Sequence, residues 1–272
     1  PDLPVYEPSI KVYEVTRGEN DQEKVGLMYV DLFSRPGVKR DGAWMNYLNP
    51  QDRDKNGNRI PPIVSITCNF SAAAEGPTYI SFDNLTTLFH EFGHALHGLL
   101  SDVKLRAQAG TNVKWDFVEL PSQFMENFAY EREVLDMFAY NEAGEVLPDS
   151  LLEAFKNSMN FGESLLFMRQ LKFGLVDMAY YTEAGAAGFD NLAEFEQEVH
   201  ELTSYLNSLF TKIPIGHAFS HIFAGGYSAG YYSYKWAEVL EADAFAMFLE
   251  SGVVLNSDLA KSFEREILSK GG

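Results

Sequence analysis

The sequence predicts an α+β fold that is mainly helical and carries one small β-sheet. Short apolar runs rich in β-branched residues occur before residue 82, and from residue 83 onward the apolar residues recur with helical spacing. Hydrophobic residues make up 46% of the 272 residues, which argues for a packed globular protein rather than a disordered one. We therefore expect a single region, residues 1–272, with a β-rich part over 1–82 and a helical part over 83–272.

Three segments of the β-rich part are predicted strands. Residues 11–15 alternate between polar and apolar side chains, residues 25–33 form an apolar run that ends before a Pro-Gly turn, and residues 63–70 form a third run. We expect these strands to form a small sheet that covers one side of the first predicted helix.

The polar segment between these strands, Asp52–Asn58, is similar to the start of a calcium-binding loop. Such a loop requires a Glu at its twelfth position, which is Ile63 here, and flanking helices, which Pro61 and Pro62 prevent. Its Asp, Asn and Gly residues are typical of turns, so we interpret the segment as a polar loop.

The helical part begins with a helix that Asp83 or Asn84 can cap and that runs to about Leu100. After a loop, Pro121 suits the first turn of a second helix that continues to about Ala139. Further helices are predicted near residues 149–158, 160–184, 190–210 and 229–250, with a short helix before Gly271.

Charge and composition exclude several kinds of partner. The net charge of -18 and the isoelectric point near 4.7 oppose binding to nucleic acid or to an anionic membrane. No apolar run approaches the 18 residues of a membrane-spanning helix. The single cysteine, Cys68, excludes an internal disulfide and favours the cytoplasm, although the periplasm is also compatible. Because the chain opens at Pro1 without an initiator Met or a leader, we expect a piece of something longer or a processed product.

The segment His90-Glu91-Phe-Gly-His94 has the spacing of a metal-binding helix. Two histidines four residues apart lie on one face of a helix, one turn apart, where they can share a metal ion. A zinc ion held in this way lowers the pKa of its bound water to about 7, and Glu91 is placed to act as general base. The alternative is a core helix with two hydrogen-bonded histidines. The apolar surroundings and the clustering of three of the six histidines within eight residues weigh against it.

A third metal ligand must come from elsewhere in the chain. The metzincin pattern requires Gly and His where this sequence has His97 and Leu100, so that class is excluded. The remaining common arrangement takes a Glu from the following helix. Glu126 and Glu131 are rivals on spacing alone, but Glu119 is favoured because the helix start directs it towards the facing helix. A plain first-turn glutamate, stabilised by the helix dipole, is the alternative interpretation of Glu119.

An aromatic, glycine-rich segment follows residue 220. On composition alone, its tyrosines and Trp236 are most simply explained as core packing. Its glycines weaken the interpretation as core packing, since glycines let the backbone pass close to a ligand. Tyr227 and Tyr234 are seven residues apart, so on a helix they would share a face.

The chain resembles the thimet oligopeptidase family of zinc peptidases over nearly its whole length. The resemblance is carried by three segments that occur in the same order as in that family: His90–His97, Gly110–Asn127 and His221–Trp236. The resemblance is to the bacterial oligopeptidases and peptidyl-dipeptidases of that family in particular. It implies a zincin-type catalytic domain with one Zn²⁺ per chain, held by His90, His94 and Glu119. It also implies Glu91 as general base and proton shuttle. His221, Tyr227 and Tyr234 are implied to contact the substrate or its tetrahedral intermediate, with Tyr231 a weaker candidate.

The implied activity is hydrolysis of short oligopeptides, either by internal cleavage or by release of C-terminal dipeptides. Members of that family are longer, with a helical N-terminal portion that walls a narrow channel and with further C-terminal helices. We therefore expect a catalytic-region fragment, whose partners are short peptides and the missing remainder of a longer enzyme. The alternative is a zinc-stabilised peptide-binding or structural fragment with little turnover in isolation.

Overall fold

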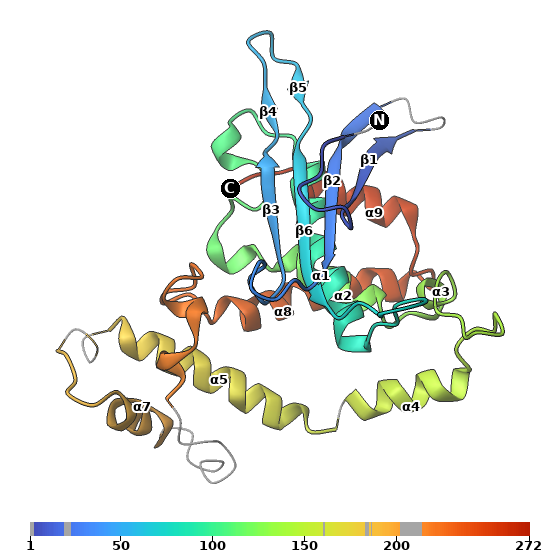
Figure 1. Cartoon of the computed structure of the whole chain (residues 1–272). Helices are drawn as coiled ribbons and strands as arrows, with labels where there is room; N and C mark the ends of the chain where they lie inside the picture. The colour runs from blue at the N-terminus through green and yellow to red at the C-terminus, as the bar shows by residue number, and fades with distance from the viewer. Residues whose placement is uncertain (1–2, 19–22, 160, 183–184, 186, 202–213) are drawn as a thin grey trace. The chain divides into compact units, whose positions relative to one another are not determined.

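A computed structural model describes residues 3–18, 23–159, 161–182, 185, 187–201 and 214–272 (Figure 1). The chain divides into two compact units, one formed by Pro1–Val146 with Ala237–Gly272 and the other by Leu147–Trp236. Among the described residues, the strands all precede residue 71, and apart from one isolated β-bridge helices supply the remaining regular structure, so the predicted mainly helical fold with a small sheet is confirmed. None of the described helices combines the length and apolar character needed to cross a bilayer.

The first unit is built on a mixed sheet with strand order β1-β2-β6-β3. Its strands are β1 (Lys11–Arg17), β2 (Glu23–Phe33), β3 (Trp44–Asn49) and β6 (Ile63–Phe70). Strands β2 and β6 run parallel at the centre, whereas β1 and β3 pair antiparallel at the edges. The three predicted strands correspond to β1, β2 and β6. The central position of β2 and β6 explains their long apolar runs, because strands buried on both faces lose the alternation of polar and apolar side chains.

Helix α1 (Phe82–Leu100) packs against this sheet, as the sequence predicted (Figure 1). The buried side chains of this core come from β2, β6 and α1: Val25, Val64, Ile66, Cys68, Phe70, Ala95 and Leu99. The predicted cap at Asp83 or Asn84 is wrong. Ser81 caps the helix, because its backbone is extended and its hydroxyl accepts the Asn84 N–H at 3.2 Å, while Asp83 already lies in the first turn.

Strand β3 and a short hairpin were not anticipated from the sequence. Strand β3 is an edge strand with alternately exposed side chains, so it lacks the continuous apolar run of β6. The polar loop lies in the hairpin formed by β4 (Asp52–Arg53) and β5 (Arg59–Ile60). The Asp54 carboxylate accepts the backbone N–H of Asn56 at 2.8 Å and of Asn58 at 2.9 Å, which explains the turn-forming composition of this segment.

The second predicted helix is shorter than expected. Helix α2 (Leu120–Phe128) ends at a turn, and α3 (Arg132–Leu135) follows, so the prediction of one helix to Ala139 is wrong. Helix α3 contributes Val134 to a core that it shares with α2 and with α8 (Ser233–Glu250). The buried members of that core are Phe124, Phe128, Val134, Phe245, Phe248 and Val254. The predicted short terminal helix is α9 (Ser257–Phe263), which continues into a π-helical turn.

Within the described residues of the second unit, three further α-helices precede α8. They are α4 (Asp149–Met159), α5 (Glu163–Tyr180) and α7 (Leu192–Glu201), and they agree with three of the predicted helices. The predicted continuation of α7 to residue 210 lies outside the described residues. Helix α8 begins at Ser233 rather than near residue 229, because Ala229 has a left-handed backbone with φ of +53° that no right-handed helix accommodates.

Candidate metal centre

The contact between α1 and α2 depends on a glycine. A Cβ atom on Gly93 would lie 2.3 Å from the carbonyl oxygen of Pro121 and 2.6 Å from Cα of Ser122, so no larger residue fits there. Gly93 lies directly before His94 and one turn after His90. The close approach at this position therefore brings the start of α2, with Glu119 as its N-terminal boundary residue, to the histidine-bearing face of α1.

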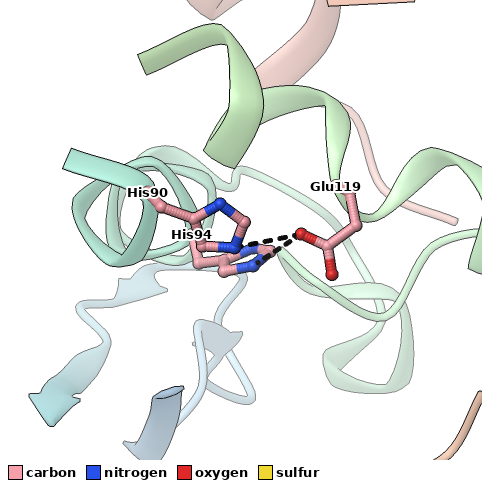
Figure 2. Close-up of side chains that lie close together, drawn as sticks. All are labelled: His90, His94 and Glu119. Carbon is pink, nitrogen blue, oxygen red and sulfur yellow. Dashed lines mark ion pairs between the residues drawn. The ribbon is translucent and has the colours of Figure 1, made fainter. Parts of the chain in front are cut away.

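Three predicted ligand side chains meet at this contact (Figure 2). Oε2 of Glu119 lies 3.2 Å from Nε2 of His90 and 3.2 Å from Nε2 of His94, and the three ligand atoms all lie within 4.8 Å of one another. Ligand atoms of a tetrahedral zinc site lie roughly 3.3 Å apart, given zinc–ligand bonds of about 2.0–2.2 Å. Two imidazoles and one carboxylate at this spacing fit a zinc ion and leave one coordination position for water or substrate.

Glu119 is held in place by its own helix. The residue is 2% exposed, and the Ser122 hydroxyl donates to Oε2 at 2.7 Å. Burial by itself would raise the pKa of Glu119, but the charge of His94 and the hydrogen bonds from both histidines hold that pKa well below its usual value. The favoured interpretation of Glu119, that it faces the two histidines, agrees with this geometry.

Glu126, which spacing alone left as a rival ligand, contacts the opposite nitrogen of His90. Its Oε1 lies 2.6 Å from Nδ1 of that ring, which leaves Nε2 facing Glu119. A carboxylate in this position orients a metal-binding histidine and makes it a stronger ligand. Burial lowers the pKa of His90, yet Glu119 and Glu126 together outweigh burial and raise it to about 10, so the site attracts a positive charge. Among the described residues, the ligand cluster includes neither Glu126 nor Glu131.

Glu91 has the properties of a proton-transfer group. Its side chain is 5% exposed, and Oε2 has no hydrogen-bond partner within the described part of the chain. Burial raises the pKa of this carboxyl, and the neighbouring His90 and His94 oppose the rise without cancelling it. A buried carboxyl with one unused oxygen and a raised pKa is suited to accept and return a proton. His97, by contrast, is a buried residue outside the ligand cluster.

The aromatic residues predicted to contact substrate lie together in the second unit. The rings of Tyr227 and Tyr234 stack with centroids 4.7 Å apart, and His221 lies 5.9 Å from the first and 6.4 Å from the second. Tyr231 is 5.2 Å from Tyr234. The expectation that Tyr227 and Tyr234 share a helix face is wrong, since Tyr227 precedes α8; the turn at Ala229 brings their rings together instead.

A helix with two histidines and a buried glutamate, facing a carboxylate from the next helix, is typical of metal-dependent hydrolases. The whole chain, residues 1–272, matches the model of Peptidase family M3, and the protein belongs to this family.

Three relatives illustrate the similarity. The chain is 42% identical to Oligopeptidase A of Escherichia coli (strain K12), an alignment that covers 100% of this chain and 40% of the relative. It is 37% identical to Probable cytosolic oligopeptidase A of Arabidopsis thaliana, over 99% of this chain and 39% of the relative. It is 34% identical to Dipeptidyl carboxypeptidase of Salmonella typhimurium, over 99% of this chain and 39% of the relative. The chain thus spans about 40% of the length of the curated relatives it matches.

Proposed function

We propose that this chain is the zincin-type catalytic region of a zinc-dependent oligopeptidase, with one Zn²⁺ held by His90, His94 and Glu119. The observation that carries the proposal is the meeting of three ligand atoms, with Glu119 Oε2 at 3.2 Å from both imidazoles. Zinc bound there would supply a Lewis acid that activates water and polarises the scissile carbonyl. Membership of Peptidase family M3 supports the same reaction class.

Glu91 is assigned the proton transfers of the reaction. Its unused Oε2 accepts the proton of the attacking water and later delivers it to the amine of the leaving peptide. A pKa raised by burial suits both steps, because the group must hold the proton between them.

His221, Tyr227 and Tyr234 are proposed to donate hydrogen bonds to the substrate or to the oxyanion that forms as the peptide bond is attacked. One such donor is worth about 3 kcal/mol of transition-state stabilisation in other hydrolases. The gathering of the three rings into one cluster supports a shared role.

We propose short, unstructured peptides as substrates. The names of the relatives support both internal cleavage and release of C-terminal dipeptides, and identity is higher to the oligopeptidases. The charge of -18 disfavours nucleic acid and anionic membranes as partners. The proposed compartment is the cytoplasm, in line with the name of the Arabidopsis relative. Because the chain spans about 40% of its relatives, the remainder of a longer enzyme is a further proposed partner.

Replacement of Glu91 tests the mechanism. Glu91→Gln removes the proton acceptor while retaining the side-chain shape, so we expect cleavage of a quenched peptide library to fall by at least about 100-fold. Zinc content, measured by mass spectrometry, should stay at one ion per chain. Glu133→Gln, which alters an exposed glutamate on α3, is the matched control and should retain full activity. Full activity in Glu91→Gln would refute this role.

A second candidate function is peptide binding or structural support without turnover. It is favoured by one observation, that the chain spans only about 40% of the length of its relatives. Zinc binding and peptide binding without any cleavage by the wild-type chain would support this alternative over the peptidase.

A further inference from the structure

A buried aspartate in the second unit fixes the segment between Tyr227 and Tyr234. The Asp177 side chain is 0% exposed. Its Oδ1 accepts the backbone N–H of Ala229 at 2.8 Å, and its Oδ2 accepts the backbone N–H of Tyr231 at 2.9 Å. Asp177 forms no ion pair with any residue that the structure describes. Both oxygens of a buried carboxylate are thus satisfied by the backbone of one short segment.

This arrangement selects one backbone conformation. A carboxylate removed from water is stable only when hydrogen-bond donors replace the lost hydration. The two donors belong to residues 229 and 231, so the backbone between them must present both N–H groups to one side. Ala229 reaches this conformation with a φ of +53° and is the one non-glycine residue in the described part of the chain with positive φ. The contact with Asp177 offsets the unfavourable left-handed backbone.

Helix α5 makes further contacts with the segment that Asp177 holds. Gln170, Phe173 and Asp177 have i, i+3, i+7 spacing and so lie on one helix face. The Tyr231 hydroxyl lies 2.7 Å from Oε1 of Gln170, and the Tyr231 ring meets Phe173 edge-on at 5.8 Å. Gln170, Phe173 and Asp177 therefore all contact the segment 229–231.

A second buried carboxylate holds the backbone earlier in the chain, before His221. Glu196 of α7 is 1% exposed and accepts the backbone N–H of Ile215 at 2.7 Å and of Gly216 at 2.8 Å. The Tyr180 hydroxyl donates to it at 2.6 Å, and Nε2 of His200 lies 4.0 Å away. Residues 215–231, which include His221 and Tyr227, are thus anchored to helices at both ends.

We propose that Asp177 is a positioning residue for hydrolysis. It holds the backbone at residues 229–231 and thereby keeps Tyr227 and Tyr234 in the stacked arrangement that they use on the substrate. The inference rests on the proposed function, because the tyrosines act only if the chain is a peptidase. Asp177 itself touches no reacting atom and acts through the amides of Ala229 and Tyr231.

Amide hydrogen exchange of the zinc-loaded chain tests the contact without any substitution. We expect the N–H groups of Ala229 and Tyr231 to exchange at least about tenfold more slowly than the N–H of Ser228, which no hydrogen bond in the described structure protects. Unprotected amides at both positions in the wild-type chain would overturn the proposal before any variant is made.

Asp177→Asn tests the role in catalysis. The amide side chain offers one acceptor in place of two, so one of the two backbone N–H groups loses its partner. We expect kcat to fall about 10- to 100-fold, as displacements of about 1 Å do in other enzymes, with KM within about twofold of wild type. Zinc content should remain one per chain, and amide protection at residues 229 and 231 should decrease. Asp190→Asn, an exposed aspartate of the same unit, makes the same change in charge and should leave all four readouts unaltered.

The outcomes separate this inference from the proposed function. Loss of amide protection with an unchanged kcat would overturn the positioning role. A fall in zinc content together with kcat would show a general folding defect and also count against it. If the wild-type chain itself does not cleave peptides, the proposed function fails, whereas the protection of the two amides and its loss in Asp177→Asn remain measurable.

Discussion

At the scale of single residues, the proposed metal centre depends on side chains that are not themselves proposed ligands. Gly93 allows α2 to approach α1, Ser122 holds Glu119, and Glu126 orients His90. Such supporting contacts determine how well three ligands are pre-organised, and their loss typically lowers metal affinity by about 10- to 100-fold. We therefore expect substitutions of these supporting residues, and not only of the proposed ligands, to weaken zinc binding.

The first prediction concerns Gly93. In Gly93→Ala the new methyl group would meet the backbone of Pro121 and Ser122 at 2.3–2.6 Å, so the two helices must separate. We expect zinc affinity to fall about 10- to 100-fold and the free energy of unfolding to fall by about 1–3 kcal/mol. Isothermal titration with zinc and denaturant unfolding measure the two effects.

The matched control for Gly93 lies in the second unit. Gly174 is in the interior of α5, and a Cβ there would meet nothing within 4 Å. Gly174→Ala should leave zinc affinity unchanged and stabilise the helix by about 0.5–1 kcal/mol. Normal zinc affinity in Gly93→Ala would show that the helix contact does not determine the position of Glu119.

At the scale of elements, the sheet is stabilised by a buried ion-pair cluster around Asp31, near the end of β2. Asp31 is buried and accepts two hydrogen bonds from Arg35, at 2.8 and 2.6 Å, and one from Lys39 at 3.0 Å. Lys39 also donates to the carbonyl oxygen of Phe33 on β2 and to that of Cys68 on β6. The cluster therefore ties the ends of the two parallel central strands, β2 and β6, together.

The second prediction is a pH dependence of this cluster. Burial alone would raise the pKa of Asp31, but the bonds from Arg35 and Lys39 outweigh it and lower that pKa from 3.8 to about 2. Because the pKa of Asp31 is lower in the folded than in the unfolded state, its ionised carboxylate stabilises the folded protein above about pH 4. This stabilisation is lost as the carboxylate is protonated between about pH 4 and pH 2. We expect a loss of about 2 kcal/mol over this range, measured by urea unfolding.

Asp31→Asn should remove this part of the acid sensitivity, and it should also lower stability at pH 7. Asp41→Asn, which alters an exposed aspartate ten residues later, should retain the wild-type profile. If the profiles of wild type and Asp31→Asn run parallel from pH 4 to pH 2, the cluster is not the origin of the acid sensitivity.

At the scale of the whole molecule, the proposed zinc ligands and the aromatic cluster belong to different units. The ligand residues lie on α1 and at the start of α2 in the first unit, and the aromatic cluster lies in the second. The boundary between the units falls within α8: Tyr234 in its first turn belongs to the second unit, and Phe245 and Phe248 belong to the aromatic core of the first.

The third prediction concerns metal removal. All three proposed ligands lie in the first unit, so zinc should stabilise that unit by about 4 kcal/mol at a free concentration 1,000-fold above its Kd. Chelation should lower the melting temperature of the first unit by about 8–16 °C. Calorimetry with and without chelator gives the shift, and amide exchange within α5 provides the internal control. An unchanged melting temperature would count against a zinc ion bound by His90, His94 and Glu119.

The sequence by itself determined the parts of the protein that depend on local spacing. Four-residue spacing on a helix places His90 and His94 together in any fold, and apolar runs identify β2 and β6 because central strands are buried along their length. The motifs also led to Glu119 and to the family. These features could be predicted because each depends only on the geometry of one helix or strand, or on the similarity of short sequence segments.

Only the tertiary structure decided which residues support the site. Spacing made Glu126 a rival ligand, and the packing of α2 on α1 turns it towards Nδ1 of His90 instead. The stacking of Tyr227 on Tyr234 and the role of Asp177 follow from a left-handed turn at Ala229, which no helical period indicates. The physical reason is that hydrogen bonds and contacts between distant segments select these positions, and their energy appears only when the elements pack.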